Sequence, residues 1–274
     1  MDRPRHSRRY LCGGLSVLAL LVATAQAEPA SEGKSAEESP RHQEWVQVSA
    51  AGERTLRTFV VYPEVNQPAH AVVVIHENRG LTPWERGLAD ELAAAGFIAI
   101  VPDLLSQAGP QKGGADSFES AGAAREAIHN LSTEQVMADI DGVVDYAMKL
   151  SAADKKVVVA GFCWGGGQAF RFAAHNPEIA AAMVFYGAAP NEEQMKQIRV
   201  PVYGFYGEND FRITGEVPKV KGKMKALGKD FQPVTYAGAG HGFLRAGEAV
   251  DAKPADRNAR ADAWKRLKDL LSKL

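Results

Sequence analysis

Short apolar runs alternate with segments of helical periodicity from about residue 71 to the C-terminus. The runs are rich in valine, isoleucine and alanine, which is typical of strands buried on both faces of a sheet. Because strand and helix alternate, the pattern predicts an α/β fold with a mostly parallel central sheet and helices on both faces. We expect strands at 71–75, 97–101, 156–160, 181–186, 200–207 and 231–238, and helices at 84–96, 132–150 and 257–273.

Two of these helices carry signals at their ends. Gly96 is the last residue of the first and marks its C-terminal stop. Ser132 and Gln135 have the spacing of a capping box at the start of the second.

The segments before residue 71 have a different character. Residues 45–64 alternate between apolar and polar positions around a glycine-containing turn, which predicts a β-hairpin. Residues 28–44 are polar and poor in bulky apolar side chains, so we expect a disordered spacer. The sequence therefore predicts one folded domain, residues 45–274.

The first 27 residues have the three parts of a secretory signal. A basic stretch, MDRPRHSRRY, precedes the apolar LCGGLSVLALLVATA and the small-residue site AQA. We therefore expect a cleaved export signal over 1–27 and a periplasmic protein, with a retained N-terminal anchor as the alternative. Arg8 and Arg9 also resemble a twin-arginine signal, which would export the folded protein, and the Sec route stays open.

The net charge and the cysteine content narrow the range of functional classes that fit the sequence. The formal net charge is −1 and no run of lysine and arginine is long, so no nucleic-acid partner is expected. Cleavage would remove Cys12 and leave Cys163 as the only cysteine, without a partner for an intramolecular disulfide. A single cysteine is often an inert core residue, and only its neighbours can indicate a reactive one.

The neighbours of Cys163 indicate a nucleophile. A buried strand runs into Gly161-Phe162-Cys163-Trp164-Gly165, and a helix is expected to follow. This is the cysteine form of the G-x-S-x-G nucleophile elbow, in which glycines allow a tight, closely packed strand-to-helix turn. The N-terminus of the helix would point its dipole at the sulfur and favour a thiolate.

An acid and a histidine follow Cys163 in the order that such a triad requires. Asp210 lies just past one predicted strand, and His241 lies in a glycine-rich loop past the last one. Catalytic groups gather at these carboxyl ends in open α/β sheets. Asp210 could instead cap a turn and His241 could be an ordinary histidine, but the combined order predicts a Cys163–His241–Asp210 triad.

Four segments carry a resemblance to the dienelactone hydrolase family of α/β-hydrolases. They are VIHENRGL (74–81), AGFCWGGG (160–167), YGENDF (206–211) and GAGHGF (238–243), and the likeness runs from about residue 60 to the C-terminal helix. The resemblance implies the α/β-hydrolase fold, the same triad, and no metal or organic cofactor.

The resemblance also assigns Glu77 a place beside the thiol. A neutral thiol bonded to a carboxylate would resist oxidation until substrate binding moves its proton to Glu77. The alternative is a structural acid paired with Arg79 or Arg86. The backbone N–H groups of Asn78 and Trp164 would form the oxyanion hole.

Two arginines complete the site that the resemblance implies, with Arg245 and Arg125 as candidates for binding a substrate carboxylate. We therefore expect a monomeric enzyme that hydrolyses small ester or lactone substrates through a thioester on Cys163. A broad-specificity exported carboxylesterase stays open because Trp164 and the export signal differ from cytosolic family members. A non-catalytic binding protein is the other alternative, and a thiol-redox role lacks a second cysteine.

Overall fold

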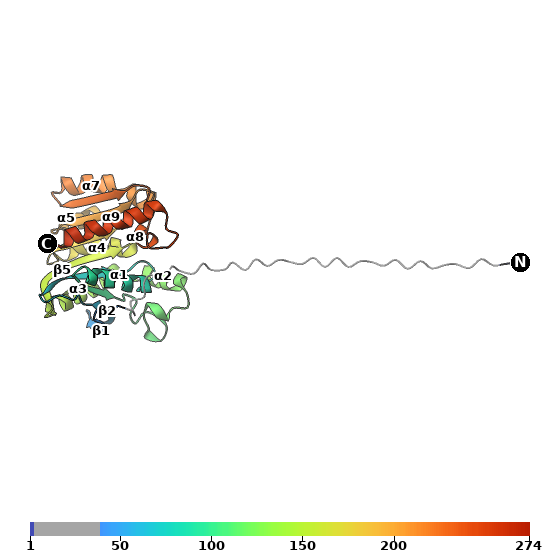
Figure 1. Ribbon diagram of the computed structural model, residues 1–274, viewed down its shortest axis with the longest axis horizontal. Coiled ribbons are helices and arrows are strands. Elements are labelled where there is room, and N and C mark those ends of the chain that lie inside the picture. The colour runs from blue at the N-terminus through green and yellow to red at the C-terminus, as the bar shows by residue number, and fades with distance from the viewer. Residues whose placement is uncertain (3–38) are drawn as a thin grey trace. The chain divides into compact units, whose positions relative to one another are not determined.

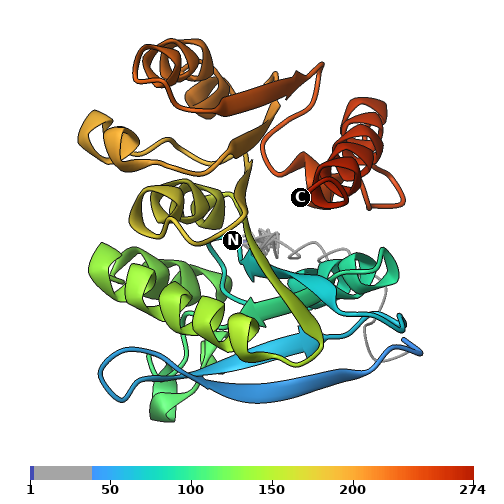
Figure 2. The same ribbon diagram turned by 90° about the vertical axis from the view of Figure 1, so that its left-hand side faces the viewer.

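A single eight-stranded sheet organises the computed structural model, which describes residues 1, 2 and 39–274. The strand order is β1-β2-β4-β3-β5-β6-β7-β8, and the strands from β4 to β8 run parallel (Figures 1 and 2). The α/β sheet expected from the sequence is therefore confirmed. The strands are β1 Gln43–Ser49, β2 Thr55–Val61, β3 Ala69–Ile75, β4 Ile98–Pro102, β5 Ala153–Phe162, β6 Ala181–Phe185, β7 Val202–Gly207 and β8 Phe231–Tyr236.

The first strand of the antiparallel hairpin begins at an earlier residue than the sequence predicted. Strands β1 and β2 form the expected hairpin, with Val46 opposite Thr58, but β1 already begins at Gln43. Arg41 forms an ion pair with Asp90 on the first helix. The predicted spacer of 28–44 is therefore wrong for the segment from residue 39 onward, which belongs to the folded domain. Apart from Met1 and Asp2, the predicted export signal lies outside the described residues, as does the rest of the spacer up to residue 38.

Helices cover both faces of the sheet (Figure 2). Alternate residues of the central strands face opposite ways: Val73 and Val159 enter the core on one side, and Val72 and Val158 the core on the other. Helices α3, α4, α5 and α7 pack on the first side, and α1, α8 and α9 on the second. The helices are α1 Pro83–Ala94, α2 Ala121–His129, α3 Thr133–Lys149, α4 Trp164–His175, α5 Glu192–Gln197, α6 Phe211–Thr214, α7 Val217–Ala226, α8 Phe243–Ala246 and α9 Pro254–Leu271, with 3₁₀ turns at Pro110–Lys112 and Ala115–Ser117.

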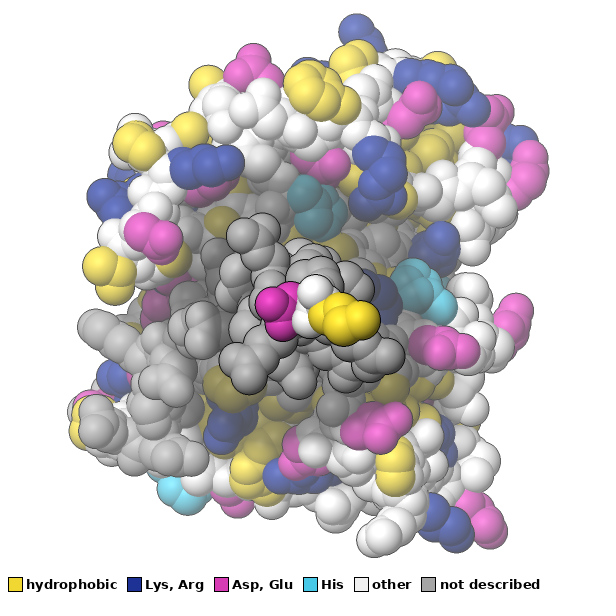
Figure 3. Space-filling view, turned by 90° about the vertical axis from the view of Figure 1, so that its right-hand side faces the viewer, with side chains coloured by type: hydrophobic (Ala, Val, Ile, Leu, Met, Phe, Trp, Pro, Cys, Tyr) yellow, Lys and Arg dark blue, Asp and Glu magenta, His cyan; other side chains and the backbone are white. Residues whose placement is uncertain are grey.

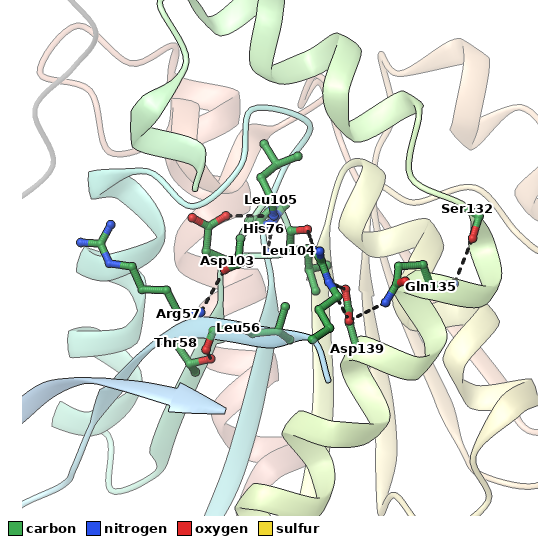
Figure 4. A network of polar contacts seen from close by, with 12 residues as sticks. Leu56, Arg57, Thr58, His76, Asp103, Leu104, Leu105, Ser132, Gln135 and Asp139 are labelled. Carbon is green, nitrogen blue, oxygen red and sulfur yellow. Dashed lines mark hydrogen bonds and ion pairs between the residues drawn. The ribbon is translucent and has the colours of Figure 1, made fainter. Parts of the chain in front are cut away.

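The structure confirms the predicted C-terminal end of α1 and changes one detail of the predicted N-terminal cap of α3. Gly96, just past α1, has φ 97°, a conformation that suits glycine at a helix stop. Ser132 caps α3 by accepting a hydrogen bond from the Gln135 backbone N–H. The Gln135 side chain does not return to Ser132, because it donates to Asp139 instead (Figure 4). The expected capping box is therefore only half formed.

The surface shows no strong separation of charge on the face in Figure 3, where acidic and basic side chains are interspersed. This agrees with the near-neutral net charge of −1. Within the described residues, no helix combines the length and the apolar character needed to cross a membrane.

Candidate active site

The turn between β5 and α4 holds Cys163 in a strained backbone conformation, with φ 56° and ψ −115°. Few residues other than glycine adopt such a positive φ, and where they do the strain often serves a functional site. A Cβ on Gly161 would lie 2.0 Å from the carbonyl oxygen of Gly165, and one on Gly165 would lie 2.4 Å from that of His76. The glycines are therefore required by close backbone contacts, as the elbow motif predicted.

The three residues expected to form a triad lie within hydrogen-bonding distance of one another. His241 Nε2 is 3.1 Å from Cys163 Sγ, and His241 Nδ1 is 2.5 Å from Asp210 Oδ2. Asp210 follows β7 and is 7% exposed, while His241 follows β8. Three separate carboxyl-terminal strand ends thus deliver a thiol, an imidazole and a carboxylate to one place.

The environment of His241 favours its protonated form. The hydrogen bond to Asp210, and next the one to Cys163, raise the pKa of His241 from 6.5 to about 9. The imidazole is therefore an imidazolium at neutral pH. A cation 3.1 Å from Sγ stabilises negative charge on the sulfur.

This raised pKa can be tested by titration. We expect Asp210→Asn to move the His241 midpoint from about 9 back toward 6.5, because the largest contributor to the shift is lost. Nitrogen chemical shifts of ¹⁵N-histidine-labelled protein would report the midpoint. Cys163→Ala, which removes a smaller contributor, should cause the smaller fall, and a wild-type midpoint near 6.5 would contradict the assignment.

A pocket of about 230 Å³ opens over Cys163 and His241. Asn78, Trp164 and Tyr186 also line it. Within the described residues, neither the Asn78 nor the Trp164 backbone N–H donates a hydrogen bond, so both are free to bind an oxyanion. The structure thus brings both expected oxyanion donors to the same pocket as the thiol.

Glu77 is buried at 4% exposure and has different partners from those expected. Its carboxylate accepts a hydrogen bond from Arg245 Nε at 2.9 Å and one from the Tyr186 hydroxyl at 3.4 Å. Within the described residues, neither the Cys163 thiol nor Arg79 bonds to this carboxylate. The structure places Glu77 next to the site, but not in the expected contact with the sulfur.

The loop that carries Glu77 is fixed by a buried histidine. Burial lowers the pKa of His76, so its ring is neutral. Its Nε2 accepts a hydrogen bond from the Leu104 backbone N–H (Figure 4), which leaves Nδ1–H to donate to the Glu77 carbonyl oxygen. The ring also stacks on Trp164, with centroids 5.6 Å apart. His76 therefore ties the loop that carries Glu77 and Asn78 to the elbow.

The two arginines assigned by resemblance lie outside the pocket lining. Arg245 is held by Glu77, and Arg125 is exposed on α2. The pocket is lined instead by Arg171 of α4 and Arg212 of α6. These two residues, and Tyr186, were not singled out from the sequence. The position of each residue in the sequence gives a signal: Arg171 lies about two helical turns after Cys163, Arg212 lies two residues after Asp210, and Tyr186 directly follows β6.

Comparison with known proteins agrees with this geometry. The model of the dienelactone hydrolase family matches residues 56–274. A Yersinia pestis protein named "Putative carboxymethylenebutenolidase" is 28% identical over 227 residues, covering 78% of this chain and 82% of that protein. A protein of the same name from Saccharolobus solfataricus is 28% identical over 250 residues, covering 80% of this chain and 94% of its own length.

Solved structures show the same fold. A crystal structure titled "Putative Dienelactone Hydrolase" from Klebsiella pneumoniae has a TM-score of 0.74 at 23% identity, covering 86% of this chain and 100% of that one. The dienelactone hydrolase of Anabaena variabilis has a TM-score of 0.60 at 20% identity, covering 81% of this chain and 95% of that one. The α/β-hydrolase fold expected from the motifs is confirmed. Since the family model matches well over half of its length, this chain belongs to the dienelactone hydrolase family and is a carboxylic ester hydrolase.

Proposed function

We propose that the protein hydrolyses small esters or lactones through a thioester formed on Cys163. The observation that carries this proposal is the bridging imidazole of His241, which lies 3.1 Å from Sγ and 2.5 Å from the Asp210 carboxylate and lines a pocket. A binding protein would have no use for a strained thiol held in this arrangement.

The first half of the reaction forms the thioester. Cys163 attacks the carbonyl carbon as the thiolate, with its proton held by His241 as the imidazolium, and the carbonyl electron pair moves to oxygen as the tetrahedral intermediate forms. The Asn78 and Trp164 N–H groups bind this oxyanion. The intermediate collapses and the C–O bond to the alcohol breaks. The leaving alkoxide takes its proton from the His241 imidazolium.

The second half returns the thiolate. Thioester formation removes the contribution of Cys163 to the raised pKa of His241, so a larger share of the imidazole is neutral and able to accept a proton at this stage. His241 takes a proton from water, and the resulting hydroxide attacks the thioester. Collapse breaks the C–S bond, releases the carboxylic acid and restores the thiolate–imidazolium pair. Asp210 holds the ring in position throughout.

Glu77 can take the protective role expected from the family resemblance only after a rearrangement. To accept the thiol proton, its carboxylate must exchange the bonds to Arg245 and Tyr186 for one to Sγ. Proton transfer to Glu77 on substrate binding therefore stays a prediction for this chain.

The direct test is hydrolysis of dienelactone and of p-nitrophenyl acetate by the purified protein, each followed by absorbance. Turnover of either substrate that is lost in Cys163→Ala supports the proposal. Turnover of the aryl ester alone favours a broad carboxylesterase. No turnover of either substrate would favour a binding role.

We also propose that the protein is exported to the periplasm as a monomer that stays free of the membrane, with residues 1–27 removed. The support is the basic, apolar and small-residue pattern of the N-terminus. We expect N-terminal sequencing of periplasmic protein to begin at Glu28 and sedimentation to give a monomer mass. An intact N-terminus in a membrane fraction would contradict the cleavage. Loss of export in an Arg8→Lys, Arg9→Lys variant would assign the twin-arginine route.

A further inference from the structure

A second pocket, of about 250 Å³, adjoins the catalytic one. It is lined by the loop after β6 and by residues of α5, α6 and α7, and is called the side pocket below. Ala188, Arg212 and Ile213 line both pockets, so the two meet at these residues. A substrate group that extends past them from Cys163 would enter the side pocket.

The base of the side pocket is apolar. Its apolar lining residues are Ala189, Pro190, Met195, Ile213, Val217 and Val220. All of them except Ala189 are buried, which places them below the charged residues of the rim. Covering this apolar surface with an apolar group would remove it from water, and such burial is favourable.

The acidic residues at the rim of the side pocket are paired with lysines. Glu192 of α5 forms an ion pair of 2.6 Å with Lys223 of α7, and Glu216 pairs with Lys219 at 3.6 Å. Arg212 is exposed, so its charge can stay in water while its aliphatic stem lines the boundary between the pockets. The buried part of the side pocket therefore suits an uncharged group.

The segment between the two pockets carries only small side chains. Gly187 and Ala189 line the side pocket, and Ala188 lines both pockets. A Cβ on Gly187 would lie 2.2 Å from the backbone carbonyl carbon of Gly166, so close packing against α4 requires glycine there. No side chain of this segment is larger than a methyl group, so a substrate chain can pass over it.

The sizes of the pockets favour their joint use. Small-molecule sites in proteins usually measure about 300–1,000 Å³. The catalytic pocket, at about 230 Å³, falls below this range alone, but the two adjoining pockets together reach it. An apolar cavity of about 150 Å³ can hold a benzene molecule, so the side pocket has room for a hydrocarbon group of about six carbons.

We propose that the side pocket binds an uncharged apolar group of the substrate, and so selects esters that carry a chain or ring of about six carbons. This inference rests on the hydrolase function proposed above and names the substrate class of that site. The group belongs either to the acyl part of the ester or to its alcohol, and the same hydrophobic contacts would hold it in both cases.

The test compares short and long esters in two series. The acyl series is p-nitrophenyl acetate and p-nitrophenyl hexanoate, and the alcohol series is ethyl acetate and hexyl acetate, followed by acid release. In at least one series we expect the wild type to favour the long ester in kcat/KM by about 10-fold or more, because its added methylenes are buried. The series that shows this preference assigns the side pocket to the acyl group or to the alcohol.

Two substitutions that fill the side pocket test its role. Val220→Phe acts from α7, and Ala189→Leu acts from the opposite wall at a partly exposed position that neither strand nor helix restricts. Each should lower kcat/KM for the preferred long ester by about 10-fold, and for the matching short ester by less than about 3-fold. Val234→Phe is the matched control, since Val234 is 37% exposed on β8 and lines neither pocket, and it should change neither value.

The outcomes separate this inference from the proposed function. The inference is overturned if the wild type favours the long ester in neither series. It is also overturned if the filled variants keep the wild-type preference, or lose activity equally toward long and short esters at unchanged melting temperature. The hydrolase proposal fails on a different result, which is no turnover of any of the four esters, or equal turnover by Cys163→Ala.

Discussion

Replacement of Cys163 by alanine is expected to lower kcat/KM for any ester substrate by about 10⁴-fold or more. The variant keeps the pocket, the oxyanion donors and the His241–Asp210 pair, but no atom remains to form the thioester. A 10⁴-fold loss corresponds to about 5.5 kcal/mol of transition-state stabilisation. Steady-state hydrolysis of p-nitrophenyl acetate measures it.

Alanine suits this test because it is subject to the same backbone restriction at φ 56° as cysteine. The variant should therefore fold, and its near-ultraviolet circular dichroism should match that of the wild type. A correctly folded variant that retains more than about a tenth of wild-type activity would contradict a nucleophilic role for Cys163.

The second large effect is expected at Gly165. A Cβ there would lie 2.4 Å from the carbonyl oxygens of both Ile75 and His76, at the end of β3. Neither carbonyl group can move without displacing the loop that carries Glu77 and Asn78. We expect Gly165→Ala to lower stability by about 3 kcal/mol and the melting temperature by about 6–12 °C, with activity lost. Thermal unfolding followed by circular dichroism measures the change.

Gly222 provides a matched control for this substitution. It lies inside α7, and a Cβ there would meet no atom within 4 Å. Gly222→Ala should raise the melting temperature by about 2–4 °C, because alanine favours the helix by about 1 kcal/mol. A Gly165→Ala variant as stable as the wild type would show that the elbow tolerates a side chain.

The elbow and the triad could be predicted from the sequence because both depend on the backbone. Gly161 and Gly165 are required because a Cβ at either position would lie less than 2.5 Å from a backbone carbonyl oxygen, and such close packing leaves a regular glycine pattern. Asp210 and His241 follow strands of a parallel sheet, whose ends meet by topology alone. Spacing and order therefore indicated which residues meet.

The partners of long side chains could not be predicted in the same way. Arg245 contacts Glu77 from a residue 168 positions away, and its choice of that acid depends on a flexible side chain rather than on a strand end. Arg171 enters the pocket because it extends back over Gly167, which only the packed helix shows. The domain edge was missed for a related reason, since Arg41 is fixed by Asp90 and not by any apolar pattern of its own.

Mass spectrometry of the protein quenched during turnover tests the central claim most directly. With p-nitrophenyl acetate, we expect a mass increase of one acetyl group, located on the peptide that contains Cys163 and removed by hydroxylamine. Deacylation should slow in Asp210→Asn, because a poorly oriented His241 activates water less well, so the adduct should accumulate there. An acyl group on another residue, or full turnover without any adduct in both proteins, would contradict the thioester mechanism.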